Sequence, residues 1–223
     1  WDAFQLANRA MFMQRTQLSI QREFEVKYTN VFPHNDELGD RIENIDYRSE
    51  KDDSFWRPFQ LAFLLMSISS IENDSLTNEE RNTVDLIWFP TGGGKTEAYL
   101  GLTAFTIFYR RLAHRDVSGG TTVIMRYTLR LLASQQFTRA STLICACEYI
   151  RQDGQKRKSL YKNYDLGDDP ITIGLWIGGA HTPNKVKGRG DNYADNYAET
   201  CYNNLSDATV KNVDSMKERY NKF

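Results

Sequence analysis

The chain has 223 residues, of which 40% are apolar and 26% charged, values that are ordinary for a globular protein and exclude a disordered or fibrous chain. The formal net charge is −1, so any surface that binds nucleic acid must be a local basic patch. The longest apolar run, 61–68, is far shorter than the roughly 20 residues that span a bilayer, so we expect no transmembrane helix.

The cysteines and the N-terminus indicate the cellular setting. Cys145, Cys147 and Cys201 are too few for a disulfide framework and favour a reducing, cytoplasmic compartment. Cys145 and Cys147 lie in an apolar run without a nearby second pair of ligands, so we interpret both as buried apolar residues rather than a metal or redox site. The chain begins at Trp1, without a signal region or an initiator methionine, and we expect it to be part of a longer protein.

In chain order, the first elements are helices separated by a polar segment. Residues 1–31 carry apolar side chains at helical spacing and predict a helix, whereas 35–53 is acidic and predicts a solvated linker. Pro58 suits the first turn of an apolar helix that we expect over 59–71. The spacing of Thr and Glu within 77–80 fits a capping box, which predicts a further helix start.

From residue 84 onward, short apolar runs alternate with helical periodicity. We predict strands at 84–89, 121–127 and 171–177, with helices at 97–112 and 128–151 between them. This alternation predicts right-handed βαβ units, hence an α/β fold with a parallel sheet flanked by helices.

We therefore divide the chain into three parts. Residues 1–53 form a helical N-terminal segment with an acidic linker, and 54–182 form the α/β lobe. Residues 183–223 form a polar tail or the start of an insertion, with a helical pattern only at 207–220.

The strongest motif is the phosphate loop, residues 89–96, with the sequence Phe-Pro-Thr-Gly-Gly-Gly-Lys-Thr. It matches the Walker A pattern G-x-x-x-x-G-K-[ST] except that Phe89 stands at the first glycine position. Glycines allow backbone N–H groups to face an anion, and the start of the following helix favours negative charge. The Lys-Thr pair disfavours the alternative of a glycine-rich turn without a ligand. The residues expected to bind ATP are Pro90, Thr91, Gly92, Gly93, Gly94, Lys95, Thr96 and Glu97, with Lys95 and Thr96 also catalytic and Thr96 a Mg²⁺ ligand.

The phosphate loop resembles the first motif of helicase superfamily 2, A-x-x-G-x-G-K-T, with Phe89 in place of Ala. Two further segments extend the resemblance in the family's order. Residues 130–135, Arg-Leu-Leu-Ala-Ser-Gln, are similar to the R-E-L-A-x-Q part of motif Ia, although Leu replaces Glu and 128–129 lacks the usual Pro-Thr. Residues 173–179 resemble the strand and double glycine that follow.

Upstream, Trp56-Arg57-Pro58-Phe59-Gln60 is similar to the R-P-x-Q form of the Q motif, which recognises adenine. The amide of Gln60 can donate and accept at once, as an adenine edge requires. The alternative is an ordinary residue on the surface of a helix.

Segments 88–101 and 125–132 resemble the helicase-like proteins of the bacterial DISARM anti-phage system. The resemblance implies a RecA-like P-loop NTPase lobe of an ATP-dependent DNA helicase or translocase, using ATP and Mg²⁺. It also implies a single-stranded DNA or duplex-end substrate and partner subunits of a defence complex. In such a sheet the phosphate loop, motif Ia and the double glycine share one edge. The implied nucleic-acid contacts are Arg126, Thr128, Arg130, Gln135, Gly178 and Gly179.

Other basic residues allow two interpretations. Arg139 lies near motif Ia, beside the implied nucleic-acid contacts. The run 151–162, which starts at Arg151, is either a second part of a DNA surface or a solvated charged face.

The sequence lacks a D-E-x-[HD] motif, whose carboxylates hold Mg²⁺ and position the attacking water. We therefore expect this motif and a second lobe outside the chain, and expect the chain alone to bind ATP with little turnover. Two other functions stay open: a P-loop kinase or NTPase with a non-nucleic-acid substrate, and a non-catalytic DNA-binding scaffold with a relic phosphate loop.

Overall fold

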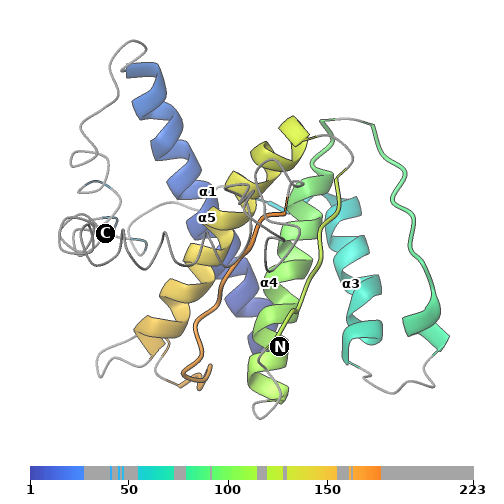
Figure 1. Ribbon diagram of the computed structural model, residues 1–223. Coiled ribbons are helices and arrows are strands. Elements are labelled where there is room, and N and C mark those ends of the chain that lie inside the picture. The colour runs from blue at the N-terminus through green and yellow to red at the C-terminus, as the bar shows by residue number, and fades with distance from the viewer. Residues whose placement is uncertain are drawn as a thin grey trace, which may run out of the picture. The chain divides into compact units, whose positions relative to one another are not determined.

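The computed structural model describes the residues 1–27, 41, 45, 47, 55–72, 79–90, 92–114, 120–127, 130–154, 161 and 163–176. These residues contain four α-helices and one 3₁₀ turn (Figure 1). The elements are α1 (Asp2–Lys27), α3 (Pro58–Glu72), η1 (Glu79–Asn82), α4 (Lys95–Ala113) and α5 (Arg130–Gly154).

The four helices predicted over 1–31, 59–71, 97–112 and 128–151 are confirmed in their described parts. Pro58 opens α3, since its fixed φ suits a first helical turn and its missing N–H would have no intrahelical partner there. The turn η1 begins within the expected capping box, whose Thr77 lies outside the described residues. Most of the predicted linker 35–53 also lies outside the described residues. So do Cys201 and the whole predicted tail 183–223 with its helix.

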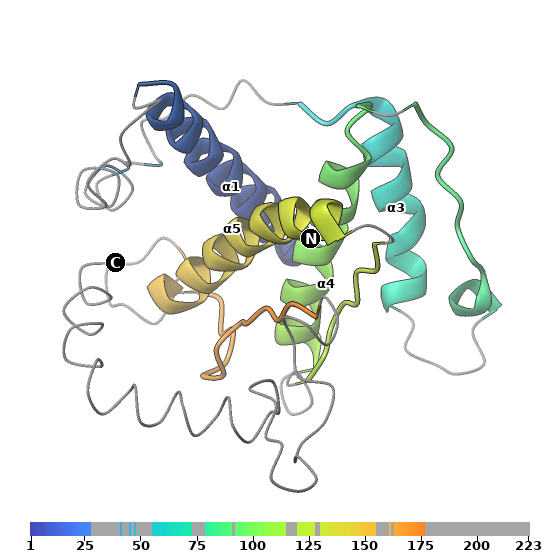
Figure 2. The same cartoon turned by 45° about the horizontal axis from the view of Figure 1, so that its top comes forward.

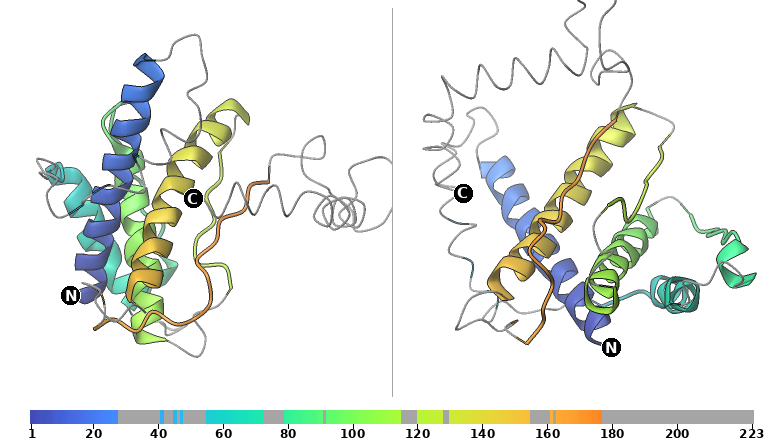
Figure 3. Two further views of the ribbon diagram at one scale, coloured as in Figure 1. Left: turned by 90° about the vertical axis from the view of Figure 1, so that its left-hand side faces the viewer. Right: turned by 60° about the horizontal axis from the view of Figure 1, so that its bottom comes forward.

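The predicted parallel sheet is wrong. Segments 84–89, 121–127 and 171–176 contain no β-strand, and Figure 3 draws the latter two as smooth traces. Val84 and Trp88, expected inside a sheet, are 93% and 88% exposed. A RecA-like α/β lobe is therefore absent from the described part of the chain, as is a shared sheet edge. Apolar and β-branched residues favour strands only where a neighbouring strand pairs with them, which a local pattern does not report.

The chain divides into two compact units. Unit 1 comprises Trp1–Ser19, Asp46–Arg126 and Thr138–Ile173, and unit 2 comprises Ile20–Ile45, Tyr127–Phe137 and Gly174–Phe223. Helices α3 and α4 lie entirely within unit 1, whereas α1 and α5 each contribute residues to both units.

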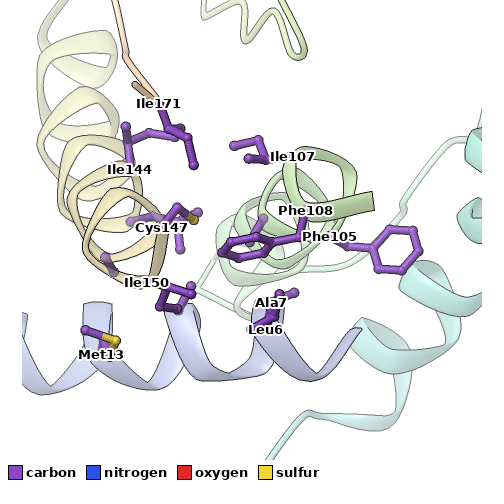
Figure 4. Packing of buried hydrophobic residues seen from close by; sticks show 14 of the residues in the cluster. Leu6, Ala7, Met13, Phe105, Ile107, Phe108, Ile144, Cys147, Ile150 and Ile171 are labelled. Carbon is purple, nitrogen blue, oxygen red and sulfur yellow. The ribbon is translucent and has the colours of Figure 1, made fainter. Parts of the chain in front are cut away.

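The hydrophobic core of unit 1 is made by three helices together with Tyr161, Leu166 and Ile171, and Figure 4 shows part of this cluster. The α1 residues recur at the helical spacing that the sequence predicts. The core side chains include Leu6, Ala7, Ala10 and Met13 of α1, Leu100, Phe105 and Phe108 of α4, and Leu143, Cys147 and Ile150 of α5.

The cysteine prediction is half right. Cys147 is fully buried, and burial raises the pKa of its thiol far above the usual range, so it stays neutral and packs as an apolar group. Cys145 is exposed, contrary to the prediction, because it lies two residues away on the outer side of α5. No described group of His, Cys, Asp and Glu side chains is arranged to hold a metal ion.

Helix α3 packs beside α4 and so brings the predicted Q motif to the phosphate loop (Figures 1 and 2). The Trp56 indole covers Gly101, where an added Cβ would lie 2.5 Å from the ring. The same indole donates to the amide oxygen of Asn8 at 2.6 Å, and Phe63 meets Tyr99 edge to face. A glycine within α4 thus permits the close approach of α3.

None of the described helices has the length and apolar content needed to cross a bilayer.

Candidate nucleotide-binding site

The phosphate loop turns the chain directly into α4. Gly92 and Gly94 have φ angles of 78° and 90°, in the left-handed region that favours glycine. The N–H of Gly93 donates to the carbonyl of Pro90 at 3.2 Å and closes the turn. Helix α4 begins at Lys95, and the N–H groups of its first turn have no acceptor within the helix. A turn of this kind before a helix N-terminus is suited to anion recognition.

The two residues expected to act on phosphate and Mg²⁺ lie in the first turn of α4. Lys95 folds back over the loop, where its Nζ donates to the carbonyl oxygens of Phe89 and Pro90 at 2.6 and 2.9 Å. Thr96 follows and is half-buried, whereas Thr91 lies outside the described residues. The ammonium group therefore lies beside the backbone of the phosphate loop, within the segment expected to hold phosphate.

Gln60 contacts the phosphate loop from α3. It is 5% exposed, so the alternative of a residue on the helix surface is wrong. Its Nε2 donates to the carbonyl of Gly94 at 2.7 Å, and its Oε1 accepts the backbone N–H of Arg57 at 2.8 Å. The Arg57 guanidinium also donates to the carbonyl of Gly93 at 2.7 Å. The R-P-x-Q segment thus holds the loop's backbone, while adenine recognition by Gln60 stays a prediction.

Phe89, the departure from the Walker pattern, has a packing role. Its ring stacks on that of Phe59, with centroids 3.9 Å apart and planes inclined by 21°. The aromatic pair joins the start of the loop to the first turn of α3. Phe89 is thereby a third link between the loop and the Q-motif segment, beside Arg57 and Gln60.

Glu97 of α4 forms an ion pair with Arg139 of α5. The sequence analysis placed Arg139 beside the residues expected to contact nucleic acid. The side chains are 38% and 28% exposed, and the Nε of Arg139 is buried without a hydrogen-bond partner. The amide of Gln14 donates to the backbone carbonyl of Arg139 at 3.3 Å. Arg139 therefore contacts the first turn of α4, next to the candidate site, which its spacing from motif Ia does not reveal.

The residues expected to contact nucleic acid are divided between the two units or lie outside the described part of the chain. Arg126 is exposed and belongs to unit 1, whereas Gln135 is exposed and belongs to unit 2. Arg130 is the first residue of α5, but its side chain lies outside the described part. Thr128, Gly178 and Gly179 lie outside it altogether.

Sequence reasoning missed a second loop with cationic partners, residues 166–171. Arg111 donates to three carbonyl oxygens of this 166–171 loop at 2.7, 3.1 and 3.5 Å, and Arg151 donates to two others at 3.0 and 3.1 Å. They are 7% and 6% exposed, so Arg151 is no part of a charged surface. Arginines at helix ends followed by a Gly-Asp-Asp-Pro turn are the only sequence signal for this arrangement.

Glu148 completes the support of the 166–171 loop. Its carboxylate accepts two hydrogen bonds from Arg151 and one, at 2.8 Å, from the backbone N–H of Ile171. Burial acts to raise the pKa of Glu148, but these bonds and one from Gln152 outweigh it and lower the pKa below its usual range. The same carboxylate raises the pKa of Arg151. The pair therefore stays charged in the folded protein.

No protein-family model matches the chain. The chain is 45% identical over 141 residues to the DISARM protein DrmA of Bacillus paralicheniformis. The alignment covers 61% of this chain but 12% of the relative, so the chain spans about one eighth of that protein's length. By sequence, the chain is therefore similar to one part of a DISARM protein DrmA.

Proposed function

We propose that the chain binds Mg²⁺-ATP at the phosphate loop and is the nucleotide-binding part of an ATP-dependent DNA helicase or translocase. The left-handed glycines at the N-terminus of α4 carry the proposal, because this backbone suits a polyphosphate and Lys95 lies beside it. The superfamily 2 resemblance of the loop and motif Ia supports DNA as the substrate rather than a small molecule.

Each residue of the site has a role in this proposal. Backbone N–H groups of Gly92 and of 94–96 surround the phosphates, while that of Gly93 closes the turn, and Lys95 exchanges its carbonyl partners for phosphate oxygens. The hydroxyl of Thr96 would hold a Mg²⁺ ion, which would offset part of the phosphate charge. Arg57 and Gln60 keep the backbone of 93–94 in place.

The similarity to the DISARM protein DrmA supports a role in defence against phage. We infer that the longer protein acts with other subunits of a DISARM system. Its whole length would supply the carboxylate that positions water. ATP turnover, DNA stimulation and subunit contacts are therefore best measured on the full-length protein.

Equilibrium titration of the chain with a fluorescent ATP analogue and Mg²⁺ tests the proposed site. Lys95→Ala removes a charge-assisted phosphate contact and should cost about 1.5–3 kcal/mol of binding free energy, at least a tenfold loss of affinity. Arg15→Ala removes one positive charge from an exposed position of α1 and should leave the affinity unchanged. Equal affinities for the wild type and Lys95→Ala would contradict the assignment.

Anisotropy titrations over several salt concentrations test the DNA part of the proposal. Contacts with phosphates make binding sequence-independent and salt-sensitive. Replacing Arg130 with Ala should weaken binding and reduce the salt slope by about one charge. Binding with an unchanged slope would mean that Arg130 serves the fold instead.

A further inference from the structure

Glu97 is placed where its charge opposes the ligand of the phosphate loop. It follows Thr96 in the first turn of α4, and its Oε2 lies 3.5 Å from the Cβ position of residue 94. A carboxylate there is favourable for the helix N-terminus but unfavourable for a polyphosphate bound to the same N–H groups. A site with this glutamate needs something that offsets its charge.

Arg139 supplies the offset from a different helix. Its Nη2 pairs with the Oε1 of Glu97, and the buried Nε shows that the guanidinium lies partly within the protein rather than out in solvent. The contact of Gln14 with its backbone carbonyl also ties this turn of α5 to α1.

We propose that Arg139 is a positioning residue of the nucleotide site, which acts through Glu97 and contacts neither the phosphates nor DNA; this rests on the proposed binding of ATP. Arg139 neutralises Glu97 and turns its carboxylate toward α5. The positive charge of Lys95 is then not cancelled by the neighbouring carboxylate. The ion pair also fixes the first turn of α4 to α5, the helix that carries motif Ia at its start.

A double-mutant cycle on Mg²⁺-ATP affinity tests this role. Arg139→Gln leaves Glu97 unpaired beside the phosphates and should weaken binding about tenfold. Adding Glu97→Gln to that variant removes the repulsion and should restore affinity to within about threefold of the wild type. If Arg139 had only a structural role, Glu97→Gln would give no such rescue, because the pair is already broken in Arg139→Gln and the second substitution restores no contact. Unchanged affinity in Arg139→Gln, or a double variant as weak as the single one, would overturn the proposal.

Two further variants keep the test informative if Arg139→Gln does not fold. Glu97→Gln alone leaves Arg139 in place without an opposing carboxylate and should tighten binding about threefold; weaker binding would contradict the proposal. Arg139→Lys keeps the charge and should stay within about threefold of the wild type. Thermal melting of each variant separates loss of fold from loss of binding.

The outcome for Lys95→Ala distinguishes this inference from the proposed function. If the wild type binds ATP and Lys95→Ala does not, the proposed ATP site is supported. The double-mutant cycle then tests the role of Arg139 separately. Should the wild type show no ATP binding, both proposals fail together. The DNA affinity of Arg139→Gln should equal that of the wild type. A lower DNA affinity would mean that Arg139 contacts nucleic acid.

Discussion

Two loops of unit 1 use the same interaction in different surroundings. In the phosphate loop, Arg57 and Lys95 donate to backbone carbonyls, and in the 166–171 loop Arg111 and Arg151 do so. Each loop also contains a glycine with positive φ. Arg57 is exposed and Lys95 half-buried, whereas Arg111 and Arg151 are nearly inaccessible.

This difference in burial decides what each loop can do. Water near Lys95 offers alternative partners, so its carbonyl bonds can be exchanged for phosphate oxygens at little cost. Arg151 cannot exchange its carbonyl partners in this way, because removing one partner would leave a buried charge unpaired. This contrast agrees with the ligand-binding role proposed for the phosphate loop, whereas the 166–171 loop is part of the framework.

The largest expected effect tests that contrast through stability. Arg151→Ala removes the cation that pairs with Glu148 and leaves two loop carbonyls without a donor. It should lower the free energy of unfolding by about 3–5 kcal/mol. Arg57→Ala breaks a bond at the surface and should lower it by no more than about 0.5 kcal/mol. Urea unfolding of both variants measures the difference. Similar losses in the two would mean that burial does not separate the loops.

The helices, and the glycine turn that leads into α4, could be predicted from the sequence because both depend on local chemistry. Helical spacing, Pro58 and the run of glycines act within a few residues, so they are visible without the fold. The failed sheet depended on pairing between segments far apart in the chain. The sequence named Arg139 and Arg151 only as basic residues near a possible DNA surface, and it did not show their partners on α4 and in the 166–171 loop for the same reason.

Glycine substitutions should separate the two loops by function. Both Gly94→Ala and Gly167→Ala place a Cβ on a left-handed residue and should cost about 1–2 kcal/mol of stability. At Gly94 the Cβ would also lie 2.6 Å from the Nε2 of Gln60, whereas at Gly167 it meets Arg111 at an ordinary 3.5 Å. We expect ATP affinity to fall about tenfold in Gly94→Ala, about 1.4 kcal/mol, and to stay unchanged in Gly167→Ala. Equal ATP affinities would contradict a ligand-binding role for residues 92–96.

The smallest expected effect concerns how Gln60 contributes to binding. Its amide already bonds the carbonyl of Gly94 and the N–H of Arg57, so we expect it to shape the loop rather than to select the base. Gln60→Glu keeps the side-chain size but cannot donate to Gly94 when ionised, a loss of about 1 kcal/mol in binding free energy. Gln5→Glu makes the same change at an exposed position of α1 and serves as the control. Titrations with ATP and GTP should show both nucleotides weakened by the same factor, because the loop holds the phosphates that they share. A loss confined to ATP would instead make Gln60 the residue that recognises adenine, as the Q-motif resemblance implies.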